Sequence, residues 1–154
     1  MAQPMSQWSR VILFGCLLCV GTFQVSGAQQ SVKSTAFSFY MEITNRPFED
    51  SLLDPSSDYY KSLESEVEDL MDKVFKCSSC GTSYTYAGAT DMTFKGGSSS
   101  VIVKTKLLFN TLIINSLVVE FLFIDKIIAD PPKALKVNLE YTKENEPMPV
   151  PATV

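Results

Sequence analysis

The sequence predicts an α+β fold of the ferredoxin-like kind, a β-α-β-β-α-β sandwich with one antiparallel four-stranded sheet and helices on one face. Three observations predict it. Four segments alternate apolar and polar residues, as half-buried strands do. Two others repeat apolar residues every three to four positions, as amphipathic helices do, and 154 residues suit a single domain. The predicted strands span residues 36–43, 82–94, 100–110 and 134–141, and the predicted helices span residues 60–74 and 115–128.

Residues 1–28 are typical of a secretory signal peptide rather than of a folded domain. Arg10 supplies a basic start, residues 11–20 form an apolar run, and small residues ending at Gly27 and Ala28 form a cleavage site. An uncleaved membrane anchor is the alternative, but the uninterrupted apolar run is shorter than the roughly 20 residues that a spanning helix needs. We therefore expect secretion, with membrane association only if this segment stays attached as an anchor.

The mature chain is expected to be acidic. Removal of the signal peptide leaves 126 residues with 12 basic and 17 acidic side chains, a net charge of −5. An acidic chain without a long basic run is a poor partner for nucleic acid and for anionic membranes. The sequence contains no histidine, and we find no catalytic triad, phosphate loop or metal cluster in it. We therefore expect no cofactor, no metal and no turnover enzyme.

The first predicted strand and helix have the clearest patterns. In strand 36–43 the apolar side chains fall on one face, and in helix 60–74 they recur at intervals of three and four. Asp54 or Ser56 is the expected cap of this helix, with Pro55 as its first residue. The predicted buried residues are Phe37, Phe39, Met41, Ile43, Tyr60, Leu63, Val67, Leu70, Met71 and Val74.

The outer face of this helix is acidic and carries Glu64, Glu66 and Glu68 among its carboxylates. A metal site or a general acid–base pair needs carboxylates that converge in a cleft. Because these residues are spread along an exposed helix, a solvated surface is the favoured interpretation. Binding of a receptor through this face is a further hypothesis.

Cys77 and Cys80 are the two cysteines that remain after the signal peptide is removed. In an exported protein, a Cys-Ser-Ser-Cys pair is expected to close into a local disulfide. Zinc would need two further ligands, and the mature chain has no other cysteine and no histidine. A redox site is the alternative, but the redox motif opens a helix, whereas this one follows a helix.

Strands 82–94 and 100–110 are predicted to form a hairpin through residues 95–99, with Gly88 at a bulge. Segment 115–128 is predicted as a helix, although its β-branched and aromatic residues also suit a strand. Its sheet-facing residues are expected to be Leu117, Val118, Phe121, Leu122, Ile124 and Ile128. The tail 142–154, with three prolines, is predicted to be extended and flexible.

Several motifs closely resemble the SEA domain of cell-surface mucins, above all that of mucin-1. They are Phe37-Ser-Phe, Ile43-Thr-Asn, the block 48–63 with its Asp-Pro-Ser-Ser-Asp-Tyr-Tyr run, and strand 100–109. The resemblance covers residues 35–141. It implies an antiparallel four-stranded sheet with helices on one face, in an extracellular module that is usually found beside a glycosylated stalk and a membrane anchor.

Many members of that family cleave themselves at a Gly-Ser bond just before a strand, and the two fragments stay associated. In this sequence the resemblance makes Ser100 the candidate nucleophile and Ser99 the source of the scissile carbonyl. Strain in the preceding peptide bond would drive the attack, so no histidine or metal is needed. Two departures favour a relaxed loop instead. Ser99 stands where the family has glycine, and the loop between Phe94 and Ser100 is expected to be longer than the family's tight loop.

The leading hypothesis is therefore a secreted mucin-like SEA module, without stalk or anchor, that acts as an extracellular structural or interaction domain. The alternative is an autoproteolytic module that cleaves itself before Ser100 by an N-to-O acyl shift. An extracellular glycoprotein or receptor is the expected kind of partner in either case.

Overall fold

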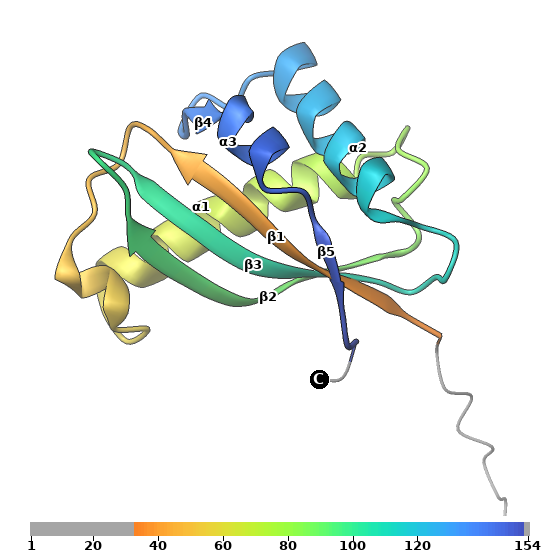
Figure 1. Cartoon of the computed structure of the whole chain (residues 1–154), viewed down its shortest axis with the longest axis horizontal. Helices are drawn as coiled ribbons and strands as arrows, with labels where there is room; N and C mark the ends of the chain where they lie inside the picture. The colour runs from red at the N-terminus through yellow and green to blue at the C-terminus, as the bar shows by residue number, and fades with distance from the viewer. Residues whose placement is uncertain (1–32, 153–154) are drawn as a thin grey trace, which may run out of the picture. The chain divides into compact units, whose positions relative to one another are not determined.

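β1 (Thr35–Ile43) is the strand around which the sheet is built, within residues 33–152, the part of the chain that the computed structural model describes (Figure 1). β3 (Val101–Phe109) pairs antiparallel with β1 along its whole length. β2 (Tyr86–Gly96) pairs antiparallel with β3 and forms one edge of the sheet. The predicted antiparallel sheet is confirmed.

The other edge of β1 is shared by two short strands. β4 (Val137–Asn138) pairs with the end of β1, and β5 (Met148–Val150) pairs with its beginning. The helix α3 (Leu139–Glu144) lies between them in the chain. Of the fourth predicted strand, residues 134–141, only Val137 and Asn138 form a strand. β5 lies in the predicted tail and brings the sheet to five strands.

The core lies between one face of the sheet and two helices, α1 (Asp58–Phe75) and α2 (Ser116–Ala129) (Figure 1). The alternating residues of β1 and β3 supply the sheet side of this core, and the apolar stripe of α1 supplies much of the helix side. All ten residues that the sequence predicts to be buried in β1 and α1 are buried. The α+β architecture with helices on one face is therefore confirmed.

The start of α1 differs from the expected one. Ser57 caps the helix, because its side chain accepts a hydrogen bond from the backbone of Tyr60. Asp54 instead accepts hydrogen bonds from the backbone and the hydroxyl of Ser56. These contacts form a turn between the 3-10 helix η1 (Asp50–Leu53) and α1. Asp54 and Ser56 are therefore turn residues and do not cap the helix.

The hairpin strand β2 begins at Tyr86 and not at Thr82. Thr82 belongs to the preceding turn, where its hydroxyl donates to the backbone oxygen of Phe75 at 2.8 Å and its own oxygen accepts from Tyr86. The bulge predicted at Gly88 is confirmed, because the pairing with β3 shifts between Tyr86 and Gly88 and the φ angle of Gly88 is +129°. Glycine suits that position because it carries no Cβ.

The segment from residue 134 differs most from prediction. The alternation in residues 134–141 predicts one strand, but the strand stops at Asn138, whose side chain caps α3 by accepting a hydrogen bond from Tyr141. The tail predicted from Thr142 is extended at Met148–Val150, as predicted, but it is not a free segment, because Thr142 and Pro147 are buried and β5 pairs with β1. Cap formation and packing on β1 outweigh the local strand pattern.

Segment 115–128 is helical, as predicted, but it buries a different face. Val119, Phe123 and Ile127 point into the core, and the ring of Phe123 lies 4.8 Å from that of Phe39. Leu122 and Ile124 are only partly buried. The remaining four residues that the sequence places against the sheet are exposed, namely Leu117, Val118, Phe121 and Ile128. Ten of the fourteen positions of this helix are apolar, so its pattern does not define the inward face.

Residues 1–32 lie outside the described part of the chain. The predicted signal peptide, with its cleavage site at Gly27 and Ala28, falls there and stays a prediction. The described residues 33–152 belong to one compact unit. Within residues 33–152, no helix combines the length and the apolar character that a membrane span requires.

Candidate functional site

The hairpin between β2 and β3 places the predicted nucleophile. Gly96 pairs with Val101, and the backbone amide of Gly97 donates to the oxygen of Ser100 at 3.0 Å. Ser98 and Ser99 alone therefore make the turn. The loop is tighter than the sequence predicts, because β2 continues through Gly96 instead of ending at Phe94.

The Ser100 side chain is held at the start of β3. It is 5% exposed, and its hydroxyl donates to Oε1 of Glu42 at 2.5 Å. The other carboxylate oxygen of Glu42 accepts from the amide of Asn138 at 2.6 Å. The carboxylate of Glu42 in β1 thus joins the residue that precedes β3 to the last residue of β4. Its hydrogen bonds span 58 and 96 residues of the chain, so the cluster forms only in the folded sheet.

The electrostatics of the cluster keep the carboxylate ionised. The hydrogen bonds from Ser100 and, second, from Asn138 lower the pKa of Glu42, against a smaller opposing effect of burial. A general base works best when its pKa lies near the ambient pH. Because the pKa of Glu42 is below that of an ordinary glutamate, this carboxylate is a good hydrogen-bond acceptor and a weak base.

The backbone around Ser100 has no left-handed residue and no cis peptide bond. Ser99 is exposed, and among residues 33–152 a positive φ occurs only at Gly88 and Asp91. The residues of the turn therefore show no left-handed strain. A Cβ added to Gly97 would collide with the Ser100 hydroxyl. The Ser100 hydroxyl therefore occupies space that is free only because residue 97 is glycine.

The Glu42 cluster makes the stability of the fold dependent on pH. A carboxylate with a lowered pKa in the folded state stabilises the fold above the pKa of the unfolded chain, and this contribution is lost as the pH falls through the lowered folded pKa. We expect acid to lower the free energy of unfolding of the natural chain more than that of Glu42→Gln. Denaturant titrations from neutral pH to about pH 3 measure both. A difference between the two chains that is the same at every pH would contradict this assignment.

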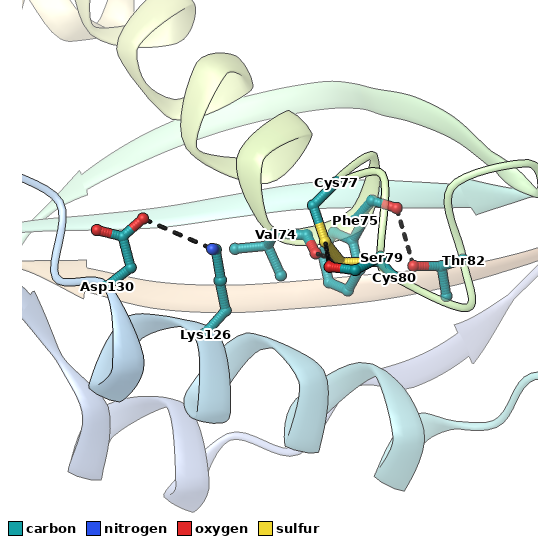
Figure 2. The surroundings of a disulfide bond; sticks show 8 residues. All are labelled: Val74, Phe75, Cys77, Ser79, Cys80, Thr82, Lys126 and Asp130. Carbon is teal, nitrogen blue, oxygen red and sulfur yellow. Dashed lines mark hydrogen bonds and ion pairs between the residues drawn. A yellow bond between two sulfur atoms is a disulfide. The ribbon is translucent and has the colours of Figure 1, made fainter.

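Cys77 and Cys80 form a disulfide in the turn that follows α1, as predicted (Figure 2). Their Cα atoms lie 5.2 Å apart, and the amide of Cys80 donates to the oxygen of Cys77. The pair follows the C-terminus of α1, where the helix dipole disfavours a thiolate. The position therefore suits a local staple better than a redox centre.

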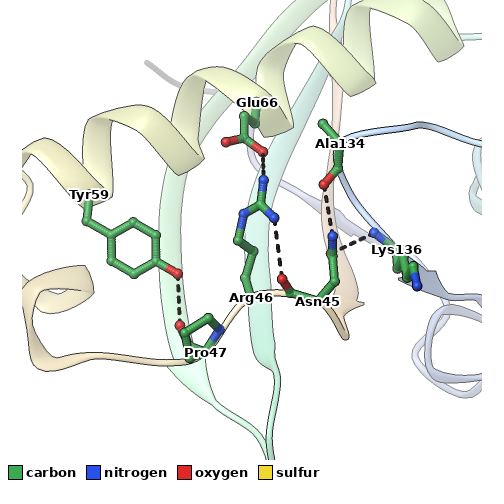
Figure 3. Close-up of polar contacts among 7 residues, drawn as sticks. All are labelled: Asn45, Arg46, Pro47, Tyr59, Glu66, Ala134 and Lys136. Atoms are coloured by element: carbon green, nitrogen blue, oxygen red, sulfur yellow. Dashed lines mark hydrogen bonds and ion pairs between the residues drawn. The ribbon is translucent and has the colours of Figure 1, made fainter.

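The acidic face of α1 is partly used within the domain (Figure 3). Glu66 forms an ion pair of 2.7 Å with Arg46, in the segment that connects β1 to η1. Nearby, Asn45 binds Ala134 and Lys136 through its side-chain amide, and the Tyr59 hydroxyl donates to Pro47. Glu66 is therefore a structural contact, and a partner at this face would meet the exposed Glu68 and its neighbours instead.

Glu68 itself remains at the surface. Partial burial, followed by the nearby Glu64, Asp72 and Asp69, raises its pKa. Within residues 33–152 no group of three or more acidic or cysteine side chains has the geometry of a metal site. The carboxylates of α1 are thus spread along the helix, in agreement with a solvated face.

Glu42, Asn138 and Gly97 are members of the site that the sequence does not single out. Glu42 occupies an outward position of the strand predicted at residues 36–43, where an exposed side chain is the ordinary expectation. Asn138 lies in a different predicted strand. Only the pairing of Ile43 with both Val101 and Val137 brings the neighbouring side chains of β1, β3 and β4 together.

The fold is that of a small α+β domain with a local disulfide. The family model described as the SEA domain matches residues 35–122, more than half of the chain. The chain therefore belongs to the SEA domain family. SEA domains occur in the extracellular regions of cell-surface or secreted proteins and are generally structural. No curated protein matches this chain.

Proposed function

We propose that this chain is a secreted mucin-like SEA module that acts as an extracellular structural or interaction domain, related most closely to the SEA modules of mucin-1 and other cell-surface mucins. The family match over residues 35–122 carries this proposal. The Cys77–Cys80 disulfide supports it, because such bonds persist in oxidising, extracellular surroundings. The ionised, hydrogen-bonded Glu42 supports a structural role for Ser100.

Secretion is tested by expression of the full chain with a C-terminal tag in secretory cells. We expect the protein in the medium, with a new N-terminus after Ala28 and with Cys77 and Cys80 oxidised. A chain whose residues 11–20 are replaced by polar residues should stay in the cells. Membrane-bound protein that keeps residues 1–28 would overturn secretion in favour of an anchor.

Self-cleavage before Ser100 is the second candidate function, and one observation favours it: the nucleophile directly follows a two-residue turn that is tighter than the sequence predicts. In the cleavage step the Ser100 oxygen would attack the carbonyl carbon of Ser99 and lose its proton to Glu42. The amide nitrogen of Ser100 would leave and take up a proton, forming an ester. Water would hydrolyse the ester to a Ser99 carboxylate and a free Ser100 hydroxyl.

The weak basicity of Glu42 and the absence of left-handed φ angles in the turn favour the uncleaved module. The intact mass of the secreted protein separates the two functions. Self-cleavage predicts two fragments that separate on denaturation, with a new terminus at Ser100, and a single chain for Ser100→Ala. The structural module predicts a single chain for both.

A further inference from the structure

α2 leaves large apolar side chains exposed on its outer side. Leu117 is 66% exposed, Phe121 66% and Ile128 64%, although Val119, Phe123 and Ile127 of the same helix are buried. Just before the helix, Leu112 and Ile113 are exposed as well. Contiguous apolar surface of this kind marks an interaction site in a soluble domain. Figure 1 shows α2 in the helical layer beside α1 and α3.

The spacing of these residues indicates the shape of what covers them. Leu117, Phe121, Ile124 and Ile128 follow one another at intervals of four, three and four. This is the spacing of the apolar seam of a coiled coil, in which each side chain packs into a hole on a facing helix. Ile124 is partly buried against the core and lies at the inner border of the seam. The complementary surface is therefore a second helix with an apolar stripe.

We propose that this stripe, Leu117, Phe121, Ile124 and Ile128, binds the same stripe of a second copy of this chain, with the two α2 helices antiparallel. In that arrangement Leu117 meets Ile128 of the other copy, and Phe121 meets its Ile124. Every seam residue then has an apolar partner and none is left over. A symmetric pairing of one patch with itself is the commonest form of protein dimer.

The charges beside the seam select the antiparallel arrangement. Glu120 lies on one flank of the stripe, and Asp125 lies on the other, beside Val118. Parallel helices would place Glu120 next to Asp125 of the second copy, twice in each dimer, and like charges there disfavour pairing. Antiparallel helices place each flank against the same flank of the second copy, so that Asp125 lies near Val118 and away from Glu120.

The energetics also suit a dimer. α2 is already folded against its own core, so pairing does not require a disordered segment to be ordered. A standard interface buries about 800 Å² on each partner, and Leu112 and Ile113, which precede α2 in the chain and are exposed, are available to such an interface as well. The inference goes beyond the proposed function, because it depends on this surface and not on secretion or cleavage.

Sedimentation velocity of the protein purified from secretory cells, over a wide range of concentrations, tests the pairing. We expect a monomer–dimer equilibrium, and we expect Leu117→Glu to raise the dimer dissociation constant by about a hundredfold or more, because each dimer loses two buried leucines. Leu53→Glu is the matched control, since Leu53 is also a leucine, is 65% exposed and lies in η1. It should leave the equilibrium unchanged, and thermal melts establish that both variants are folded.

Cysteine pairs test the orientation. A chain with Leu117→Cys, mixed with a chain carrying Ile128→Cys under mild oxidation, should give a disulfide-linked pair, whereas either chain alone should not. Linkage of the Leu117→Cys chain to itself would indicate parallel helices and overturn the proposed arrangement.

Three further results would overturn the dimer. The natural chain could stay monomeric at every concentration, or it could form a stable complex with a different protein. It could also be a monomer that keeps residues before Gln29 and shows slow hydrogen exchange in α2. The last would place the chain's own N-terminal segment on the stripe.

Discussion

Replacement of Phe109 by alanine is expected to lower the free energy of unfolding by about 3–5 kcal/mol. Phe109 ends β3 and is fully buried. Its ring lies 5.5 Å from the ring of Phe75 in α1, 5.3 Å from that of Tyr86 in β2 and 6.1 Å from that of Phe37 in β1. The alanine variant loses these contacts and leaves a cavity where three strands and a helix meet.

Denaturant titration at low protein concentration measures this loss. Tyr84→Ala is the control, because Tyr84 is an aromatic residue of the neighbouring turn that is 96% exposed, and surface substitutions usually change stability by less than about 0.5 kcal/mol. A Phe109→Ala chain as stable as Tyr84→Ala would show that the aromatic cluster is not the centre of the core.

Gly97→Ala and Ser100→Ala are each expected to lower the free energy of unfolding by about 1.5–3 kcal/mol, which is the range for a hydrogen bond to a charged group. Ser100→Ala removes the hydroxyl that donates to Glu42. Gly97→Ala adds a methyl group in the space of that hydroxyl and forces it away from the carboxylate. Because both changes break the same hydrogen bond, the double variant should lose about as much free energy of unfolding as either single variant.

The double-mutant cycle measures this coupling directly. Gly81→Ala is the matched glycine control, because an added Cβ there meets nothing within 4 Å. Ser99→Ala is the matched serine control, since Ser99 is exposed. The stability lost in the double variant could instead equal the sum of the two single losses within about 0.5 kcal/mol. That result would refute the idea that both changes act through the Ser100–Glu42 hydrogen bond.

Strong local patterns predict most of this fold. The alternation of Phe37, Phe39, Met41 and Ile43 and the three-and-four spacing in α1 identify both the elements and their buried faces. In α2 the helix is predicted but its buried face is not, because the helix carries apolar residues on most of its sides. In residues 134–141 the local pattern predicts one strand, whereas the capping side chain of Asn138 ends it and starts α3. The pairing of β5 with β1 lies in the predicted tail, where no local pattern indicates it.

The candidate site is predicted in part for a similar reason. Cys77 and Cys80 are close in sequence, so their disulfide can be predicted from spacing. Ser100 is identified by family resemblance. Glu42 and Asn138 reach it only through the register of three strands that are distant in sequence, and no local pattern carries that register.

The intact mass of the protein from the culture medium, measured under denaturing conditions, tests the central claim most directly. The structural SEA module predicts one chain that begins near Gln29 and is two hydrogens lighter than its reduced form, because Cys77 and Cys80 are joined. Two fragments divided before Ser100, absent from the Ser100→Ala chain, would contradict it and establish self-cleavage as the function of the hairpin.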